Sequence, residues 1–285
     1  MKIIDLFSGI GGFALGFQRA GYQFTEHYFS EIDKHAIANY KHNFPHAKYI
    51  GDITTLHGGD FTDIDIITFG SPCQDFSLAG KREGLKGAKS SLIQHAIALI
   101  TDIRPSIFIW ENVKGAFSSN AGADFWAILK EFANIGGYRL EFQLLNTEWV
   151  LPQNRERIYL IGHLAGRSTP RVFPIGEITK DSSKKTRNIY DYSRTILRGY
   201  KNSTSTGSFI KTKDNKIRYL TEIECERLQG FPDNWTQYGN YNERIRRISK
   251  TQRYKLIGNA VTVDIVTMIA KRLKFIEYEN HKIPC

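Results

Sequence analysis

The 285-residue chain carries 39 Lys and Arg residues against 29 Asp and Glu, which gives a formal net charge of +10. A hydrophobic content of 41% and an aromatic content of 13% exclude a disordered chain and predict a globular core. The length suffices for one large α/β domain and a small second domain, and the charge predicts a polyanionic partner. Nucleic acid is the usual partner of this kind, and an anionic membrane surface is the alternative.

No apolar run approaches the ~18 residues that a membrane span requires. The N-terminus reads directly as a strand and lacks the pattern of a secretory signal. The three cysteines, Cys73, Cys225 and Cys285, have neither disulfide nor metal-ligand spacing. We therefore expect a reduced, cytoplasmic protein that binds no metal and no membrane.

The first predicted element is a strand from Ile3 to Phe7, which leads into a turn containing Gly9, Gly11 and Gly12. A helix is predicted from Phe13. Glycines at such a turn let the backbone approach a ligand, and the helix N-terminus offers free N–H groups. An ordinary tight turn is the alternative, and the GxGxxG spacing of dinucleotide-binding folds is absent.

Two acidic positions follow. The segment from Tyr28 to Asp33 reads as a short strand that ends in acids, and Glu31 lies about 20 residues after the glycine turn, where a carboxylate suits a ribose diol. Asp52, in a Gly-Asp-Ile sequence, reads by itself as a turn residue.

Cys73 lies on a loop at the end of a second predicted strand. The apolar run from Ile64 to Phe69 ends at Gly70, so Cys73 is expected at the carboxyl edge of the sheet, where open α/β sheets place their ligands. By itself, a single cysteine is more often a small buried side chain than a nucleophile. The segment that follows Ser77 is basic and rich in glycine, which favours a flexible loop.

Glu111 ends a further apolar strand, Arg104 to Val113, which follows a helix predicted over Leu92 to Ile103. This places its carboxyl group beside the Cys73 loop, where burial would favour the protonated form. A helix-capping role is the alternative. Beyond a predicted amphipathic helix at 125–135, the strands Tyr138 to Leu145 and Arg157 to Gly162 are expected.

Two arginines, Arg155 and Arg157, lie two positions apart in the extended sequence Pro152 to Arg157. Alternate residues of a strand point to the same face, so both guanidinium groups are expected to face one ligand. A salt-bridged surface pair is the alternative.

Residues 164–217 carry 12 Lys and Arg against 4 Asp and Glu, a net of +8. Such a basic region with aromatic and hydroxyl side chains suits contact with a nucleic-acid groove, and a disordered linker is the alternative. Eight apolar residues are expected to form its small core: Ile189, Tyr190, Tyr192, Ile196, Leu197, Tyr200, Phe209 and Ile210.

The C-terminal part begins with a helix that Thr221 and Glu224 cap reciprocally, and that contains a structural Cys225. A second basic cluster suited to phosphates follows, formed by Arg244, Arg246, Arg247, Lys250 and Arg253. The sequence Gly258 to Val263 opens the last helix.

Several of these segments together resemble the cytosine-5 DNA methyltransferase family of bacterial and phage restriction-modification systems. They are DLFSGIGG from Asp5, Pro72-Cys73-Gln74, Glu111-Asn112-Val113, the QNRER sequence ending at Arg157, and GNAV from Gly258. They occur in the family's order. The departures are Ile32, where many members have an aromatic residue, and Thr147 to Leu151.

The resemblance implies an α/β fold: a Rossmann-like, S-adenosylmethionine-dependent methyltransferase with a mixed sheet flanked by helices and a small target-recognition domain. Residues 1–163 and 255–285 would form the catalytic domain, and residues 164–254 the target-recognition domain with its seating segment. The cofactor is S-adenosyl-L-methionine, which leaves as S-adenosyl-L-homocysteine. Its expected contacts are Phe7, Gly9, Gly11, Gly12, Glu31, Ile32, Asp52, Ile53, Pro72, Asn259, Ala260 and Val261.

The resemblance also implies a mechanism. The thiolate of Cys73 adds to carbon 6 of a flipped cytosine and makes carbon 5 nucleophilic. Protonated Glu111 donates to ring nitrogen 3, Arg157 binds the exocyclic oxygen, and Arg155 orients Glu111 or a phosphate.

The expected partner is double-stranded DNA, methylated at a short site of roughly 2 to 4 base pairs by the few base-edge contacts available. We expect a monomer associated with the nucleoid, functionally paired with a restriction endonuclease. Two alternatives remain: a transfer-RNA cytosine methyltransferase, whose Cys-Phe-Thr signature is missing at Ser205 to Phe209, and a non-catalytic DNA-binding relative.

Overall fold

The computed structural model describes residues 1–71, 91–115, 122–167, 169, 171–176, 193–196, 209–211 and 214–280. Pro72 and Cys73, and most of the segment expected to read DNA, lie outside these residues. The predictions for Pro72 and Cys73 therefore stay predictions.

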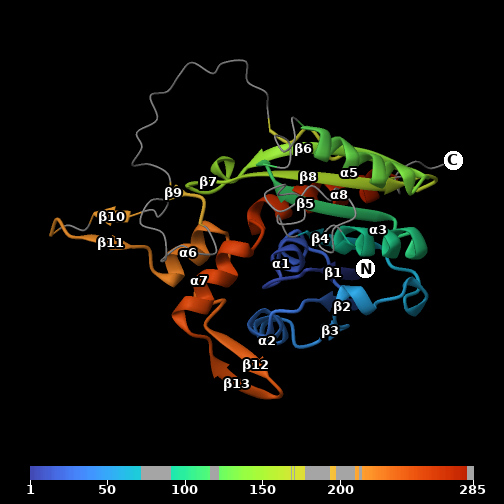
Figure 1. Cartoon of the computed structure of the whole chain (residues 1–285). Helices are drawn as coiled ribbons and strands as arrows, with labels where there is room; N and C mark the ends of the chain where they lie inside the picture. Colours follow the sequence, from blue (N-terminus) through green and yellow to red (C-terminus); the bar gives the residue numbers. More distant parts are fainter. Residues whose placement is uncertain are drawn as a thin grey trace, which may run out of the picture.

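A seven-stranded sheet forms the centre of the molecule, with the strand order β3-β2-β1-β4-β5-β8-β6 (Figure 1). Its strands are β1 (Lys2–Leu6), β2 (Glu26–Ser30), β3 (Lys48–Tyr49), β4 (Ile66–Gly70), β5 (Ile107–Val113), β6 (Tyr138–Asn146) and β8 (Glu156–Leu164). β1 to β5 pair in parallel, whereas β8 runs antiparallel to both of its neighbours. The sheet is therefore mixed, as predicted.

Helices cover both faces of this sheet because its strands are apolar on both sides. On one face lie α1 (Gly12–Arg19) and α8 (Val263–Asn280), and on the other lie α3 (Ser91–Ile103) and α5 (Ala123–Asn134). The helices predicted at 92–103 and 125–135 are thus confirmed. α2 (Lys34–Asn43) belongs to a third apolar cluster, beside the β1–α1 turn.

The last helix returns to the first one. Gly16 of α1 lies under Val266 of α8, where a Cβ on Gly16 would come within 2.5 Å of Val266 Cγ1. The side chains of Val263 and Val266 are fully buried. The two ends of the chain therefore build one core.

The smaller elements, which are β7 and those between β8 and α8, gather beside one end of the main sheet (Figure 1). They are β7 (Gln153–Asn154), β9 (Ser193–Arg194), β10 (Phe209–Lys211), β11 (Ile217–Tyr219), α6 (Glu222–Leu228), β12 (Tyr238–Tyr241), β13 (Arg244–Arg247) and α7 (Lys250–Asn259). Short 3-10 helices lie at Ile53–Thr55, Gly58–Asp60 and Thr147–Trp149. The capping box predicted for α6 is present.

Ile196 is fully buried, but among residues of α6 and α7 rather than within a local core. It packs with Leu220, Cys225, Tyr254 and Ile257. The structural role predicted for Cys225 is confirmed. The other residues of the predicted core lie outside the described part of the chain, except for Ile210, which packs against the same cluster, and Phe209, whose backbone alone is described.

Candidate active site

The turn between β1 and α1 combines open backbone with close packing. Phe7, Gly9 and Gly11 have positive φ angles of 49°, 54° and 82°. A Cβ on Gly9 would meet nothing within 4 Å, whereas one on Gly11 would reach Phe44 at 2.3 Å and one on Gly12 would reach Val261 at 2.6 Å. Gly9 therefore leaves room for a ligand, and the other two glycines allow α1 to pack.

Glu31 is held in place by three backbone N–H groups. Its Oε2 accepts from Gly9 at 2.9 Å, and its Oε1 accepts from Ile32 at 2.8 Å and from Asp33 at 2.9 Å. Asp33, in turn, caps the N-terminus of α2. The carboxylate is thus fixed at the carboxyl end of β2, directly beside the open position at Gly9.

Ile32, next in the chain, is an unusually exposed apolar side chain, with 73% of its surface accessible. Asp52 caps the 3-10 helix at Ile53–Thr55, where its Oδ1 accepts from Thr54 at 3.0 Å. Ile53 has its side chain in the core. The three residues lie at the ends of β2 and β3, where Tyr49 also donates a hydrogen bond to the carbonyl of Glu31.

Ser71, the last described residue before Cys73, is buried and fixed from β5. Its Oγ accepts from Trp110 Nε1 at 3.0 Å and from Asn112 Nδ2 at 3.1 Å. The strand register places Gly70 directly opposite Glu111. The chain therefore enters the Cys73 loop at a defined point beside Glu111, as predicted from the sequence.

Glu111 is 8% exposed and forms an ion pair with Arg157 of β8. The Nε of Arg157 lies 3.1 Å from Oε1 of Glu111, and its Nη1 donates to the carbonyl of Glu156. A Cβ on Gly70 would lie 3.1 Å from Oε2 of Glu111, so glycine gives this carboxyl group its space. A carboxyl group and a guanidinium group thus lie together at the carboxyl ends of β4 and β5.

Arg155 reaches a different place, contrary to the expectation that both arginines face one ligand. Its guanidinium group is buried and donates to the carbonyl oxygens of Ala260 at 2.7 Å and Ile196 at 3.3 Å. Arg155 lies in the break between β7 and β8, where strand alternation no longer applies. It joins β8 to the end of α7.

Gln153 completes this connection. Its Nε2 donates to the carbonyl of Leu228 at the end of α6, and its Oε1 accepts from the N–H of Ile196. Thr262 similarly pairs with Thr147 at 2.8 Å. The QNRER sequence therefore fastens the C-terminal helices to the sheet, a role that sequence analysis did not assign to Gln153.

The GNAV sequence lies against the glycine turn. Ala260 and Val261 are buried, and Val261 packs on Gly12, whereas Asn259 is exposed at the end of α7. The structure thus brings Val261 to the β1–α1 turn, as expected for a shared pocket.

Beneath this turn lies a buried polar chain. Asp5 accepts hydrogen bonds from Thr68 at 2.9 Å and from Tyr40 at 3.1 Å, and Tyr40 lies 2.7 Å from Nε2 of His27. Burial raises the pKa of Asp5 to about 8, and burial lowers the pKa of His27 to about 4. Both groups are therefore held largely uncharged near neutral pH.

The residues of the second basic cluster fall into two groups, one buried and one exposed. Arg253 is buried and pairs with the fully buried Glu226, with its Nη2 at 2.8 Å from Oε1. The prediction of a phosphate contact for Arg253 is therefore wrong, because its charge is already compensated within the fold. Arg244, Arg246, Arg247 and Lys250 are exposed.

Sequence reasoning missed three residues of this site: Ser71, Trp110 and Gln153. Ser71 and Trp110 lie next to motifs, Gln153 lies within one, and each forms a buried hydrogen bond that supports its motif. Their only signal in the sequence is a polar group within a largely buried segment. Within the described ranges, no cluster of three or more His, Cys, Asp or Glu side chains could bind a metal, and no helix is long and apolar enough to cross a membrane.

The mixed sheet thus carries a glycine turn after β1, a fixed acid after β2 and a Glu–Arg pair at the carboxyl ends of β4 and β5. The model of the C-5 cytosine-specific DNA methylase family matches residues 1–203 and 167–275. The chain belongs to this family. It is accordingly a DNA cytosine-5 methyltransferase.

Relatives of full length support this assignment. The Type II methyltransferase M.Bsp6I of Bacillus sp. (strain RFL6) is 30% identical, over 96% of this chain and 98% of its own. M.NlaX of Neisseria lactamica is 31% identical, over 96% of both chains. The fold is similar to that of the Dnmt2 methyltransferase of S. pombe, with a TM-score of 0.74, 21% identity and coverage of 99% of this chain and 100% of that one.

Proposed function

We propose that this enzyme takes the methyl group from S-adenosyl-L-methionine and places it on carbon 5 of a flipped cytosine, after covalent addition of Cys73. The observation that carries the proposal is the Glu111–Arg157 pair, which lies at the point where the chain enters the Cys73 loop. This pair offers one acidic and one cationic group to a single planar base.

The residues around Gly9 fit the cofactor. Glu31 is oriented by three N–H groups and has lone pairs left to accept from ribose hydroxyls, and Gly9 leaves open space beside it. The exposed Ile32 offers an apolar surface to an adenine ring, opposite Phe7. Asp52, Ile53, Pro72 and the residues Asn259 to Val261 would complete the pocket. When bound, the cofactor supplies an electrophilic methyl group.

The protein's residues prepare the base to accept that group. The Cys73 thiolate forms a bond to carbon 6, and the displaced electron pair moves toward carbon 5 and ring nitrogen 3. The Glu111 carboxyl group passes a proton to nitrogen 3, and Arg157 binds the exocyclic oxygen. After methylation, nitrogen 3 returns its proton to Glu111, a base removes the proton of carbon 5, and the electron pair of that C–H bond forms the ring double bond as the Cys73 sulfur leaves as a thiolate.

Arg155 serves as a positioning residue in this scheme. Its buried hydrogen bonds to Ala260 and Ile196 hold β8 and the end of α7 together, and Arg157 follows it by two residues. We therefore propose that Arg155 acts through the position of Arg157.

The substrate is proposed to be double-stranded DNA with a short recognition sequence, read by the basic region within 164–254. A base inside a duplex cannot be reached by Cys73, so the reaction requires base flipping. We further propose a cytoplasmic monomer that acts on the DNA of the nucleoid and is paired with a restriction endonuclease, as the names of the Type II relatives suggest for those proteins.

The test is methyl transfer from labelled S-adenosylmethionine to unmethylated genomic DNA and, in parallel, to total transfer RNA, with bisulfite sequencing of the products. We expect labelling of DNA at one short motif, and no labelling by the Cys73→Ser variant. Labelling of transfer RNA alone, or labelling that persists in Cys73→Ser, would contradict the proposal.

A further inference from the structure

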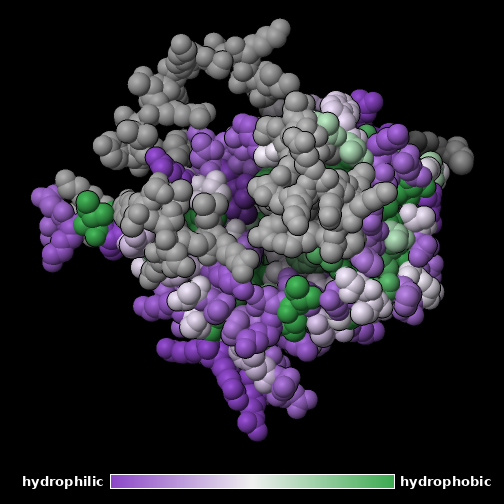
Figure 2. Space-filling view, in the orientation of Figure 1, coloured by the Kyte–Doolittle hydropathy of each residue, from purple (hydrophilic) through white to green (hydrophobic). Residues whose placement is uncertain are grey.

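The β12–β13 hairpin follows the basic segment at 164–217 in the chain, and its arginines pair with no carboxylate in the described part of the structure. Figure 1 shows it extending from the end of the molecule that holds α6 and α7, and Figure 2 shows its surface as strongly hydrophilic. Asn242 and Glu243 form its tip with φ angles of 49° and 66°, the signature of a tight two-residue hairpin turn.

One strand of the hairpin is anchored firmly. Asn39 of α2 donates to the carbonyl of Tyr238 at 2.8 Å, and the hydroxyl of Tyr241 lies 2.6 Å from Nδ1 of His35. Gly239 is packed so closely on α2 that a Cβ there would lie 2.9 Å from that of Ala38. β12 is therefore a rigid base for its partner strand.

The other strand, β13, is exposed at every position. Arg246 pairs with Gly239, which has no side chain to cover it, and Arg244 pairs with Tyr241. Arg247 stacks on the ring of Tyr238 at 5.8 Å. Within the described ranges, Arg244, Arg246 and Arg247 form no ion pair with a carboxylate, in contrast to the buried Arg253.

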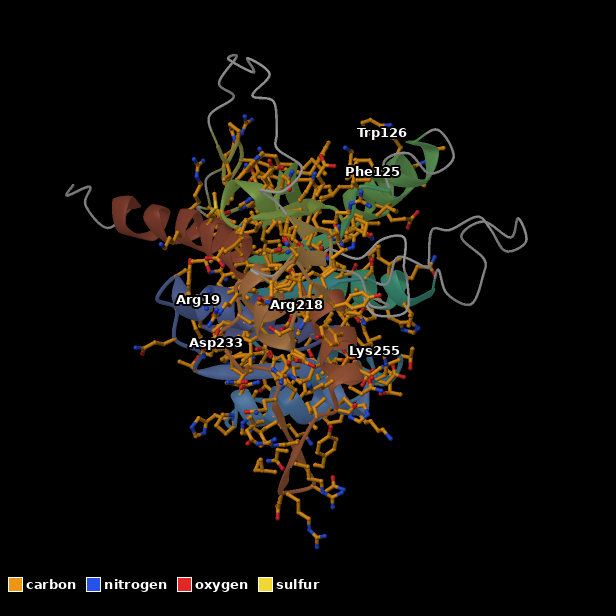
Figure 3. All side chains as sticks on the ribbon, turned by 90° about the vertical axis from the view of Figure 1, so that its left-hand side faces the viewer. Arg19, Phe125, Trp126, Arg218, Asp233 and Lys255 are labelled. Carbon is orange, nitrogen blue, oxygen red and sulfur yellow. The ribbon has the colours of Figure 1, made fainter. Side chains whose placement is uncertain are left out.

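We propose that this hairpin grips the sugar–phosphate backbone of duplex DNA outside the recognition sequence. The proposal rests on the proposed function, which makes duplex DNA the partner. Exposed guanidinium groups on a rigid strand suit phosphate oxygens, and such contacts add affinity without reading sequence. Figure 3 shows the hairpin projecting at the bottom of the view, away from the labelled Arg218 and Lys255.

The charges have one competing explanation: arginines on an unpaired edge strand discourage pairing with other chains. The two explanations differ in their dependence on salt. Each phosphate contact contributes a slope of about −0.9 to the logarithm of affinity against the logarithm of salt concentration, whereas edge protection contributes none.

The test compares Arg244→Gln/Arg246→Gln with Lys130→Gln/Lys271→Gln, a matched removal of two exposed charges from α5 and α8. The first variant keeps the Arg247–Tyr238 contact and hence the hairpin. Affinity for a labelled duplex of about 30 base pairs is measured by fluorescence anisotropy at several salt concentrations. We expect roughly tenfold weaker binding at low salt and a slope smaller by about 2 for the hairpin variant only.

Equal slopes for the two variants would overturn the proposal, as would weaker binding of transfer RNA with unchanged binding of DNA. An increase in association without a change in slope would establish edge protection instead. Because binding is measured without methyl transfer, a failure of the proposed chemistry is seen separately, in the activity of the unaltered enzyme. Methylation kinetics add a second readout: the hairpin variant raises KM for DNA.

Discussion

At the residue scale, Arg155 and Arg157 show how neighbouring residues of one motif divide their tasks. Arg157 pairs with Glu111 at the carboxyl ends of β4 and β5. Arg155 is buried against the carbonyl groups of Ala260 and Ile196. Removing the first should impair the chemistry, and removing the second should impair the fold.

We expect Arg157→Gln to lower kcat by at least about 100-fold with little change in thermal stability. Arg155→Gln should instead lower the free energy of unfolding by about 2 to 4 kcal/mol, because it leaves buried carbonyl oxygens without donors. Thermal unfolding and single-turnover methylation separate the two effects. If both variants lost activity at unchanged stability, the positioning role of Arg155 would be wrong.

Asp5 makes stability depend on pH. The pKa of Asp5 is about 8 in the fold, against 3.8 for an aspartate in water, so the folded chain retains a proton that the unfolded chain loses. Stability contributed by this group therefore falls as pH rises from about 4 to about 8. The pKa of His27 is lowered to about 4, so His27 has the opposite effect on stability, but only below pH 6.5, the ordinary pKa of a histidine.

The window from pH 6.5 to 8 thus isolates Asp5. We expect the free energy of unfolding to fall by about 2 kcal/mol across it, and Asp5→Asn to abolish most of that fall. Urea denaturation at several pH values measures this. A variant with the same slope as the original protein would show that another group titrates.

The sequence located Glu111 at the edge of the sheet because it directly follows the apolar run Ile107 to Trp110, and its neighbour across the sheet is Gly70. The partners of Arg155 could not be inferred, since they lie 41 and 105 residues away in the chain. Long-range hydrogen bonds leave no local pattern in the sequence.

At the element scale, the contact between α1 and α8 depends on Gly16. A Cβ there would lie 2.5 Å from Val266 Cγ1 and 3.2 Å from the backbone N of Thr267, so the helices would have to move apart. Gly16→Ala is therefore expected to destabilise the protein by about 1 to 3 kcal/mol, despite the better helix propensity of alanine.

Gly59→Ala is the matched control, because its added methyl group would meet nothing within 4 Å. Chemical denaturation of both variants tests the prediction. A Gly16→Ala protein as stable as the control would show that α8 can shift without cost.

Helices and strands could be predicted from the sequence where their apolar residues follow one clear periodicity or form one continuous run. The apolar face of α3 and the buried runs of β4 and β5 are of this kind. The β12–β13 hairpin was missed, since its strands are polar and its Asn-Glu turn lacks the glycine of common hairpins. The placement of Ile196 against α6 and α7 was missed for a different reason: only tertiary packing determines it.

At the scale of the whole molecule, cofactor binding should be visible as global stability. A ligand that binds only the folded chain adds about 2.7 kcal/mol at 100 times its Kd. We expect S-adenosylhomocysteine to raise Tm accordingly. The Glu31→Gln variant should need at least about ten times more ligand for the same rise in Tm.

Glu243→Gln, at the exposed tip of the hairpin, is the control and should respond as the original protein does. Equal responses of the two variants would remove Glu31 from the cofactor site.

The packing of α1 against α8 has a consequence for how the enzyme folds during its synthesis. Val261 and Val266 pack on glycines of the β1–α1 unit, although some 250 residues of chain separate them. During translation, the apolar face of α1 stays uncovered until α8 has been synthesised, because α8 completes the core on that face of the sheet. We therefore expect that two fragments separated between β8 and α6 are inactive alone and become active when they associate.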